Sequence, residues 1–200
     1  YERGIKKMPD IKDEVVVIGS GNVAFDVART LIRFQNEKFG KSNVTMLALE
    51  TSEQVPADIE EVEEGTQEGI KLELGWGPQQ IAFDKKTDKI TGVNACKCTS
   101  LFDEKGRFSP KFDSDDKKFV DAKQVYLAIG QMPDYSYIPK DVQENMSIEE
   151  GKIKTNKSGQ VKGFPWMFAG GDIVRGMDII NGIADGHEAA IGIDKYLTKK

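Results

Sequence analysis

A glycine-rich turn between a short apolar run and an amphipathic segment constrains the fold of this 200-residue chain more than any other feature. Residues 15–18, Val-Val-Val-Ile, are apolar and β-branched, which is typical of a buried parallel strand. The turn that follows reads Gly-Ser-Gly-Asn-Val-Ala and matches the pattern G-x-G-x-x-A. Apolar side chains then recur at steps of three and four over residues 22–34, which predicts a helix. Strand, turn and helix in this order predict the first unit of a Rossmann-like sheet.

Three positions of the turn have distinct physical tasks. Gly19 allows the tight turn off the strand, and Gly21 lets the backbone approach a pyrophosphate with no Cβ in the way. Ala24 keeps the helix close to the sheet, while the helix N-terminus presents unpaired N–H groups to the phosphates. We therefore expect a dinucleotide to bind at the whole turn, Gly19, Ser20, Gly21, Asn22, Val23 and Ala24. The alternative is a degenerate Rossmann domain that only packs.

The following segments continue the alternation of strands and helices. After a polar connection at 36–43, strands are expected at 43–50 and 70–75. Between them, residues 57–70 predict a helix with Ile59 and Val62 facing inward and its carboxylates outward. This order is half of a doubly wound parallel sheet, so the expected fold class is α/β.

After residue 76 the pattern changes to short alternating strands joined by polar turns, which predicts an antiparallel β-meander at 77–84, 89–103 and 117–122. A buried strand is expected again at 124–130. After turns and weak strands, a last strand at 163–172 leads into Gly170-Gly171-Asp172. A closing helix is expected at 178–197.

The end of the second strand bears on the choice between the two nicotinamide cofactors. An acidic side chain there accepts hydrogen bonds from the adenosine ribose and repels a 2′-phosphate. Glu50 ends this strand, further from the turn than the usual roughly 20 residues because the connection is long. We therefore expect NAD(H) to be preferred over NADP(H). If Glu50 is only a solvated loop carboxylate, the cations that could receive a phosphate are Arg29, Arg33 and Lys41.

Composition argues against several other classes of protein. The net charge of −5 disfavours a nucleic-acid partner, and no apolar run approaches the roughly 18 residues of a membrane span. No signal peptide is evident, and two cysteines suggest a reducing compartment, so a cytoplasmic location is expected. We expect no metal site and no catalytic acid or base. Structural or surface roles are expected for Cys96, Cys98, His187 and the carboxylates of 58–64.

Four stretches resemble the pyridine nucleotide–disulfide oxidoreductase superfamily, and within it the branch of the glutamate synthase small (beta) subunit. The first is the strand, turn and helix of residues 15–30, and the second is VPADIEEVEEGTQEGI at 55–70. The third is VYLAIGQMPD at 125–134, similar to the hinge of that family, and the fourth is MFAGGDIVRGMDIINGIADGHEAAIGIDKYL at 167–197, similar to its flavin motif. All four occur in the order of the family.

The resemblance implies a nicotinamide domain inserted into an FAD-binding domain. The expected organisation is a linker at 1–13, an NAD(P)H-binding Rossmann domain at 14–132, and the C-terminal part of the FAD-binding domain at 133–200. The upstream FAD and iron–sulfur portion would lie outside this chain, which reads as a piece of a longer protein. Any iron–sulfur cluster must also lie outside it, since a cluster needs about four thiolates.

The resemblance also implies further cofactor contacts. Asp172 would bond a ribityl hydroxyl of FAD, and the start of the last helix, at Ile179 and Ile180, would point its dipole at the flavin. The remaining implied contacts are Ala128, Ile129, Gly130, Gln131 and Gly171. In one respect the chain departs from the pattern. Many relatives carry two arginines, suited to NADP(H), where Leu49 and Glu50 stand here.

The expected function is therefore part of an FAD-dependent NAD(P)H oxidoreductase. Hydride would pass between nicotinamide and FAD, and electrons would go on to a partner subunit, a ferredoxin or an iron–sulfur cluster. That step needs positioning and exclusion of water rather than a protein acid or base. A non-catalytic nucleotide-sensing module and a dehydrogenase with its own small-molecule substrate are the alternatives.

Overall fold

The computed structural model describes residues 10–176 and 178–198. It divides into two compact units, one ending at Gly130 and one beginning at Gln131. The division lies two residues before the expected domain boundary. Of the expected linker at 1–13, residues 1–9 lie outside the described part, and Ile11 is buried in the core of the first unit.

The first unit is built on a four-stranded parallel sheet of order β3-β2-β1-β7. Its strands are β1 (Val15–Ile18), β2 (Val44–Ala48), β3 (Lys71–Leu74) and β7 (Gln124–Leu127). Helices α1 (Asn22–Phe39) and α2 (Ile59–Gln67) connect the first three strands. This is the predicted half of a doubly wound sheet, so the α/β fold class is confirmed.

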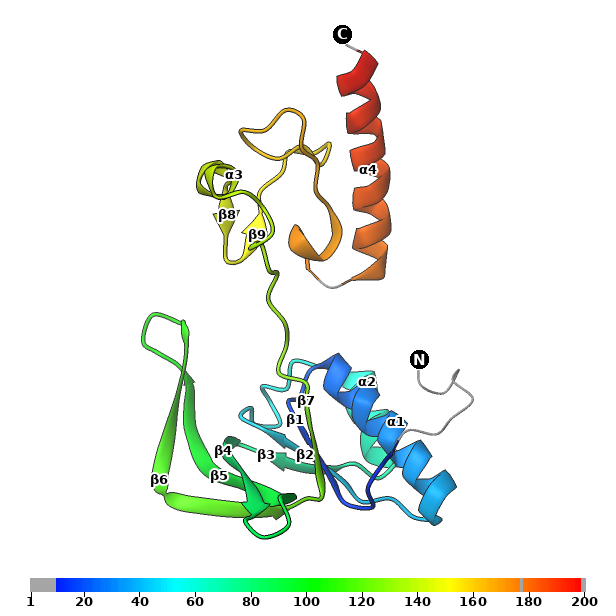
Figure 1. Cartoon of the computed structure of the whole chain (residues 1–200), viewed down its shortest axis with the longest axis vertical. Coiled ribbons are helices and arrows are strands. Elements are labelled where there is room, and N and C mark those ends of the chain that lie inside the picture. The colour runs from blue at the N-terminus through cyan, green and yellow to red at the C-terminus, as the bar shows by residue number, and fades with distance from the viewer. Residues whose placement is uncertain (1–9, 177, 199–200) are drawn as a thin grey trace. The chain divides into compact units, whose positions relative to one another are not determined.

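Both faces of this sheet are covered, and each face has its own apolar cluster. Val15 and Val17 face the cluster formed with α1, whereas Val16 and Ile18 face the cluster formed with the meander. Successive residues of a strand point to opposite faces, so a strand buried on both sides must be apolar throughout. Figure 1 shows the helices on one side of the sheet and the antiparallel strands on the other.

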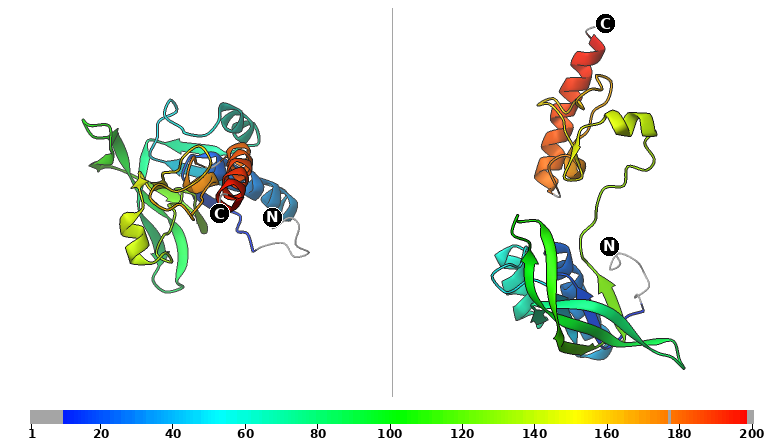
Figure 2. Two further views of the ribbon diagram at one scale, coloured as in Figure 1. Left: turned by 90° about the horizontal axis from the view of Figure 1, so that it is seen from above. Right: turned by 90° about the vertical axis from the view of Figure 1, so that its left-hand side faces the viewer.

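The antiparallel strands form the predicted meander, with order β4-β5-β6. They are β4 (Trp76–Asp84), β5 (Lys89–Phe102) and β6 (Phe108–Asp121). β5 and β6 continue beyond Trp76, the first residue of β4, as a two-stranded ribbon, which can be followed in Figure 2. β6 is longer than expected because its polar first half pairs with β5 out to this ribbon.

Helix α1 runs five residues beyond its predicted end at Phe34, into the stretch expected to be a polar connection. Its last turns are stabilised by polar contacts, which the apolar pattern of the sequence does not reveal. The Gln35 side chain is buried, donates to the carbonyl of Lys12 and accepts from the amide of Asn43. Gly40 ends the helix with a φ of 70°, a left-handed conformation that glycine adopts without strain.

Val23 of the glycine turn is 56% exposed. Ile59, which was expected to face inward, is 67% exposed instead and is the first residue of α2. Val62, one turn further along α2, packs on the core as expected.

β7 is less buried than expected because it is an edge strand of the described sheet. Leu127 at its end is exposed. No helix in the described ranges combines the length and apolar character that a membrane span requires.

The second unit contains α3 (Lys140–Asn145), the short pair β8 (Ile148–Glu149) and β9 (Lys152–Ile153), a 3₁₀ turn at Gly171–Ile173, and α4 (Ile179–Thr198). The closing helix is confirmed, whereas the strand expected at 163–172 is wrong. Only an isolated bridge between Gln160 and Phe168 forms there. Its backbone groups are used locally, since Val161 donates to Met167 and Ala169 donates to Gly159.

Candidate dinucleotide-binding site

Gly19 is required by a contact with a distant strand. Its φ is 124°, and a Cβ built on it would lie 2.2 Å from the carbonyl oxygen of Ala128. The amide of Ala128 donates to the carbonyl of Ile18, so the segment after β7 lies against the turn after β1. Glycine here serves the turn, as predicted, and also the close approach of a second backbone.

Gly21 stands in a different environment. It caps α1 in an extended conformation, with φ −80° and ψ 173°, and no side chain caps this helix end. A Cβ built on Gly21 would meet nothing within 4 Å. The amides of Asn22 and Val23 have no acceptor among the described residues. The first turn of α1 therefore presents unpaired N–H groups beside open space, an arrangement suited to a phosphate.

The other residues of the turn fix its position. Ala24 is fully buried, which brings α1 close to the sheet as predicted. The Asn22 side chain exchanges two hydrogen bonds of 2.8 Å with Asp58, one with its carboxylate and one with its amide. Because Asp58 precedes α2, this pair ties the starts of the two helices together. Asn22 can therefore contribute its backbone amide to a ligand, but its side chain is already engaged.

Glu50 follows β2 at the carboxyl edge of the sheet and is held at both ends. Its carboxylate accepts a hydrogen bond of 2.8 Å from the hydroxyl of Ser20, which is 3% exposed. Its carbonyl oxygen accepts from the amide of Gly75, which follows β3, at 2.7 Å. Glu50 thus belongs to the glycine turn and is more than a solvated loop carboxylate.

Arg29 and Arg33 are committed to α2. Arg29 forms ion pairs of 2.6–2.9 Å with Glu61, Glu64 and Glu68, and Arg33 also pairs with Glu68. The hydrogen bonds that Arg29 donates to Glu68, and then to Glu61, raise its pKa. The carboxylates of α2 are therefore only partly a solvated face, because several of them clamp α2 to α1.

Lys41 lies before β2, at the opposite edge of the parallel sheet from Glu50. Arg29 and Arg33 are therefore already paired with carboxylates, and Lys41 lies at the amino edge of the sheet, away from Glu50. No group of His, Cys, Asp or Glu within the described ranges could hold a metal ion.

The hinge residues divide between the two units. Ala128 contacts the glycine turn, Ile129 is exposed, and Gly130 has a φ of 85°. Gln131 begins the second unit and forms no hydrogen bond with a described residue. The structure therefore brings Ala128 of the first unit to the turn.

In the second unit, the Gly-Gly-Asp segment is anchored by a residue that sequence reasoning missed. Asp185 of α4 is only 4% exposed, and its carboxylate accepts from the Gly171 amide and pairs with Arg175, both at 2.8 Å. The Asp172 side chain is exposed and has no hydrogen bond among the described residues. The missed signal was an acidic residue among apolar positions on one helix.

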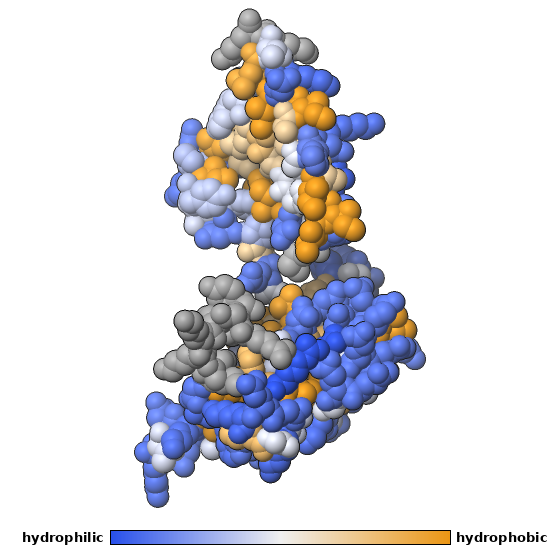
Figure 3. Space-filling model, turned by 90° about the vertical axis from the view of Figure 1, so that its right-hand side faces the viewer, coloured by the Kyte–Doolittle hydropathy of each residue, from blue (hydrophilic) through white to orange (hydrophobic). Residues whose placement is uncertain are grey.

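The start of α4 is partly capped. The Asp178 carboxylate accepts from the amide of Ile180 at 2.7 Å and from that of Asn181 at 3.4 Å. Ile179 and Ile180 themselves are highly exposed. Figure 3 shows apolar side chains gathered on this part of the second unit. The exposed apolar residues of α4 are Ile179, Ile180, Ile183, Ile191, Ile193 and Leu197.

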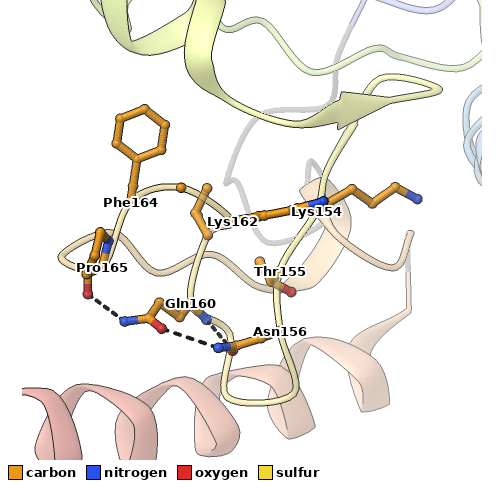
Figure 4. A pocket seen from close by; sticks show the side chains of 9 residues that line it. Lys154, Thr155, Asn156, Gln160, Lys162, Phe164 and Pro165 are labelled. Atoms are coloured by element: carbon orange, nitrogen blue, oxygen red, sulfur yellow. Dashed lines mark hydrogen bonds between the residues drawn. The ribbon is translucent and has the colours of Figure 1, made fainter.

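A shallow pocket between residues 154 and 165 is drawn in Figure 4. Its polar groups bond to one another, because Gln160 donates to the carbonyl of Pro165 and accepts from the Asn156 side chain. It therefore gives no reason to assign a ligand.

Cys96 and Cys98 are free thiols, and burial raises the pKa of Cys98.

Comparison with known proteins places this geometry in a class. In fold, the chain is similar to the thioredoxin reductase of T. acidophilum, with a TM-score of 0.69 and 20% identity over 93% of this chain and 52% of that chain. Residues 3–190 match the family described as pyridine nucleotide-disulphide oxidoreductase, and the chain belongs to that family.

Two curated relatives refine the comparison. One is the glutamate synthase [NADPH] small chain of Escherichia coli (strain K12), 31% identical over 92% of this chain and 38% of its own length. The other is the NADP(+)-dependent formate dehydrogenase subunit beta of Moorella thermoacetica, 28% identical over 96% of this chain and 26% of its own length. The resemblance to the glutamate synthase small subunit is thereby confirmed. The chain spans well under half the length of either relative.

Proposed function

We propose that the first unit binds a nicotinamide dinucleotide with its pyrophosphate at the turn of residues 19–24. The observation that carries this proposal is the uncapped start of α1. Two free amides and a glycine without a Cβ face open space at the carboxyl edge of a parallel sheet, where such sheets receive ligands.

NAD(H) is the preferred cofactor in this proposal. Glu50 is held by Ser20 beside the turn, where its carboxylate would accept from the ribose hydroxyls and repel a 2′-phosphate. Arg29 and Arg33 are occupied by α2. The names of the two relatives specify NADP(+) and NADPH, so this preference would be a departure of the present chain. It rests on Glu50 standing where the resemblance leads us to expect an arginine.

The second unit would contribute to an FAD site completed by residues outside this chain. The chemistry that bound FAD would supply is hydride exchange with the nicotinamide and delivery of electrons to a partner subunit or cluster. The free carboxylate of Asp172 fits a contact with a ribityl hydroxyl, and Asp185 holds the backbone beside it. The helix start fits less well, because Asp178 already accepts from the Ile180 amide. The exposed apolar face of α4 suits burial beneath the remaining part of such a domain.

The proposal is tested by Gly21→Ala. The backbone at Gly21 has a φ of −80°, which alanine adopts without strain, and the added Cβ would meet no other atom within 4 Å. The thermal midpoint of the first unit should therefore not fall. Because the methyl would occupy the space of the pyrophosphate, the affinity for NADH in a calorimetric titration should drop at least about tenfold, which corresponds to about 1.4 kcal/mol. Gly186→Ala, another site where a Cβ meets nothing, is the matched control and should bind as the wild type. Unchanged binding in Gly21→Ala would overturn the proposal.

A further inference from the structure

Lys97 of β5 carries an unpaired ammonium group beside the candidate site. It stands opposite Trp76 in the antiparallel register, and its Nζ lies 4.8 Å from the centroid of the Trp76 ring. The same Nζ is 3.2 Å from the position that a Cβ on Gly75 would occupy. Within residues 10–176 and 178–198, Lys97 forms no ion pair and no hydrogen bond through its side chain.

The backbone connects this ammonium group to Glu50. Gly75 follows β3, and its amide donates to the carbonyl of Glu50, which follows β2. β2 and β3 are parallel, so both segments lie at the carboxyl edge of the sheet. The amide of Cys98 in turn donates to the carbonyl of Gly75. Burial is the main cause of the raised pKa of Cys98, and Glu50 adds to the rise while Lys97 opposes it. Both charges therefore act on the same neighbourhood.

The neighbouring cations differ from Lys97 in being occupied. Lys118 of β6 shares the Trp76 ring, at 4.6 Å, but its Nζ also pairs with Glu73 at 2.6 Å. Arg29 and Arg33 are paired with carboxylates of α2. An ammonium without a carboxylate partner is the group best placed to meet an added anion at this edge.

We propose that Lys97 is a specificity-determining residue of the adenosine site, acting against Glu50. Its charge would attract a 2′-phosphate that the carboxylate repels, so the preference between NAD(H) and NADP(H) would be set by the balance of the two charges. This inference rests on the proposed nucleotide site. It adds to that site a residue that selects the cofactor and that belongs to the meander, not to the strands and helices from β1 to β3.

Half-nucleotide probes test the inference, because 2′,5′-ADP and 5′-AMP differ only in the 2′-phosphate. The 200-residue chain is titrated calorimetrically with each probe as wild type, Lys97→Gln and Lys118→Gln, and again with Glu50→Gln added to each. We expect Lys97→Gln to weaken 2′,5′-ADP about five- to tenfold and to leave 5′-AMP unchanged in both backgrounds. The Lys118→Gln variants should bind both probes like their parents.

The outcomes separate this inference from the proposed function. If 5′-AMP binds and Lys97→Gln leaves the affinity for 2′,5′-ADP unchanged, the role of Lys97 is wrong and the nucleotide site stands. If Lys97→Gln weakens both probes equally, Lys97 does not distinguish the cofactors and the inference is again overturned. If neither probe binds the wild type or Glu50→Gln, the nucleotide site itself is refuted, and the inference with it.

Discussion

The hydroxyl of Ser20 donates a hydrogen bond of 2.8 Å to the carboxylate of Glu50 and so joins the glycine turn after β1 to the end of β2. The second residue of a G-x-G-x-x-A turn needs no particular side chain for the turn itself. Here it orients the group that would select the cofactor, and it is almost completely buried while doing so. In this account the phosphate-binding turn and the ribose-reading carboxylate are one hydrogen-bonded unit.

Replacing Ser20 by alanine removes this bond and leaves the Glu50 carboxylate free to turn away. In the proposed site the ratio of the dissociation constants for NADPH and NADH should fall about fivefold, which corresponds to about 1 kcal/mol. Thr51→Ala is the control, since the Thr51 hydroxyl bonds to Gln54 instead. An equal change in the two variants would show that the Ser20 bond does not govern cofactor choice.

Gly19→Ala should destabilise the first unit, in contrast to Gly21→Ala. The new side chain would be placed at φ 124° and would meet the backbone oxygen of Ala128. We expect the free energy of unfolding, measured by urea denaturation, to fall by about 1–3 kcal/mol. A variant as stable as the wild type would mean that the segment after β7 does not pack on the turn as described.

The clamp between α1 and α2 should make stability depend on pH through Glu68. Hydrogen bonds from Arg33, then Arg29, lower the pKa of Glu68, although burial acts the other way. A carboxyl with a lowered folded pKa stabilises the protein above its ordinary pKa of about 4.3, and this contribution is lost as the pH falls through the folded pKa. The stability difference between wild type and Glu68→Gln should therefore be constant near neutrality and shrink in acid.

The control for that comparison is Glu63→Gln, because Glu63 is exposed and forms no ion pair with a described residue. Its unfolding free energy should follow that of the wild type in urea titrations from pH 7 to pH 3. A difference between wild type and Glu68→Gln that stays the same across this range would contradict the assigned pairing.

Asp185→Asn should loosen the Gly-Gly-Asp segment without FAD being present. The substitution weakens the ion pair with Arg175 and the charged acceptor of the Gly171 amide. Amide exchange over residues 170–175 should accelerate about tenfold, which corresponds to about 1.4 kcal/mol of local opening. Glu188→Gln, which removes only the outer partner of Arg175, should have a smaller effect. Equal exchange in Asp185→Asn and wild type would remove Asp185 from this role.

The sequence predicts the first unit well because its decisive signals are local. The apolar run at 15–18 requires burial on both faces of a sheet, and the glycine turn requires a helix directly after it. Contacts between segments that are distant in the sequence could not be predicted from such local signals. The carbonyl of Ala128 beside Gly19 depends on how separate strands meet. So does the buried Gln35 side chain, which accepts from the amide of Asn43.

In the second unit, too, contacts between distant residues limited what the sequence could predict. Residues 163–172 have the apolar character of a strand, but the amides of Phe164, Met167 and Ala169 donate within the loop of residues 156–169. Asp185 could have been suspected as an acidic residue among apolar positions of a helix. Its partners, the Gly171 amide and Arg175, follow only from the folded backbone.

The most direct test of the account is a pair of calorimetric titrations, with NADH and with NADPH, on the wild type and on Glu50→Gln. We predict that the wild type binds NADH at least about tenfold more tightly than NADPH, and that Glu50→Gln removes most of this difference, chiefly by improving the binding of NADPH. Tighter binding of NADPH by the wild type, or a preference for NADH that is unchanged in Glu50→Gln, would contradict the role assigned to Glu50.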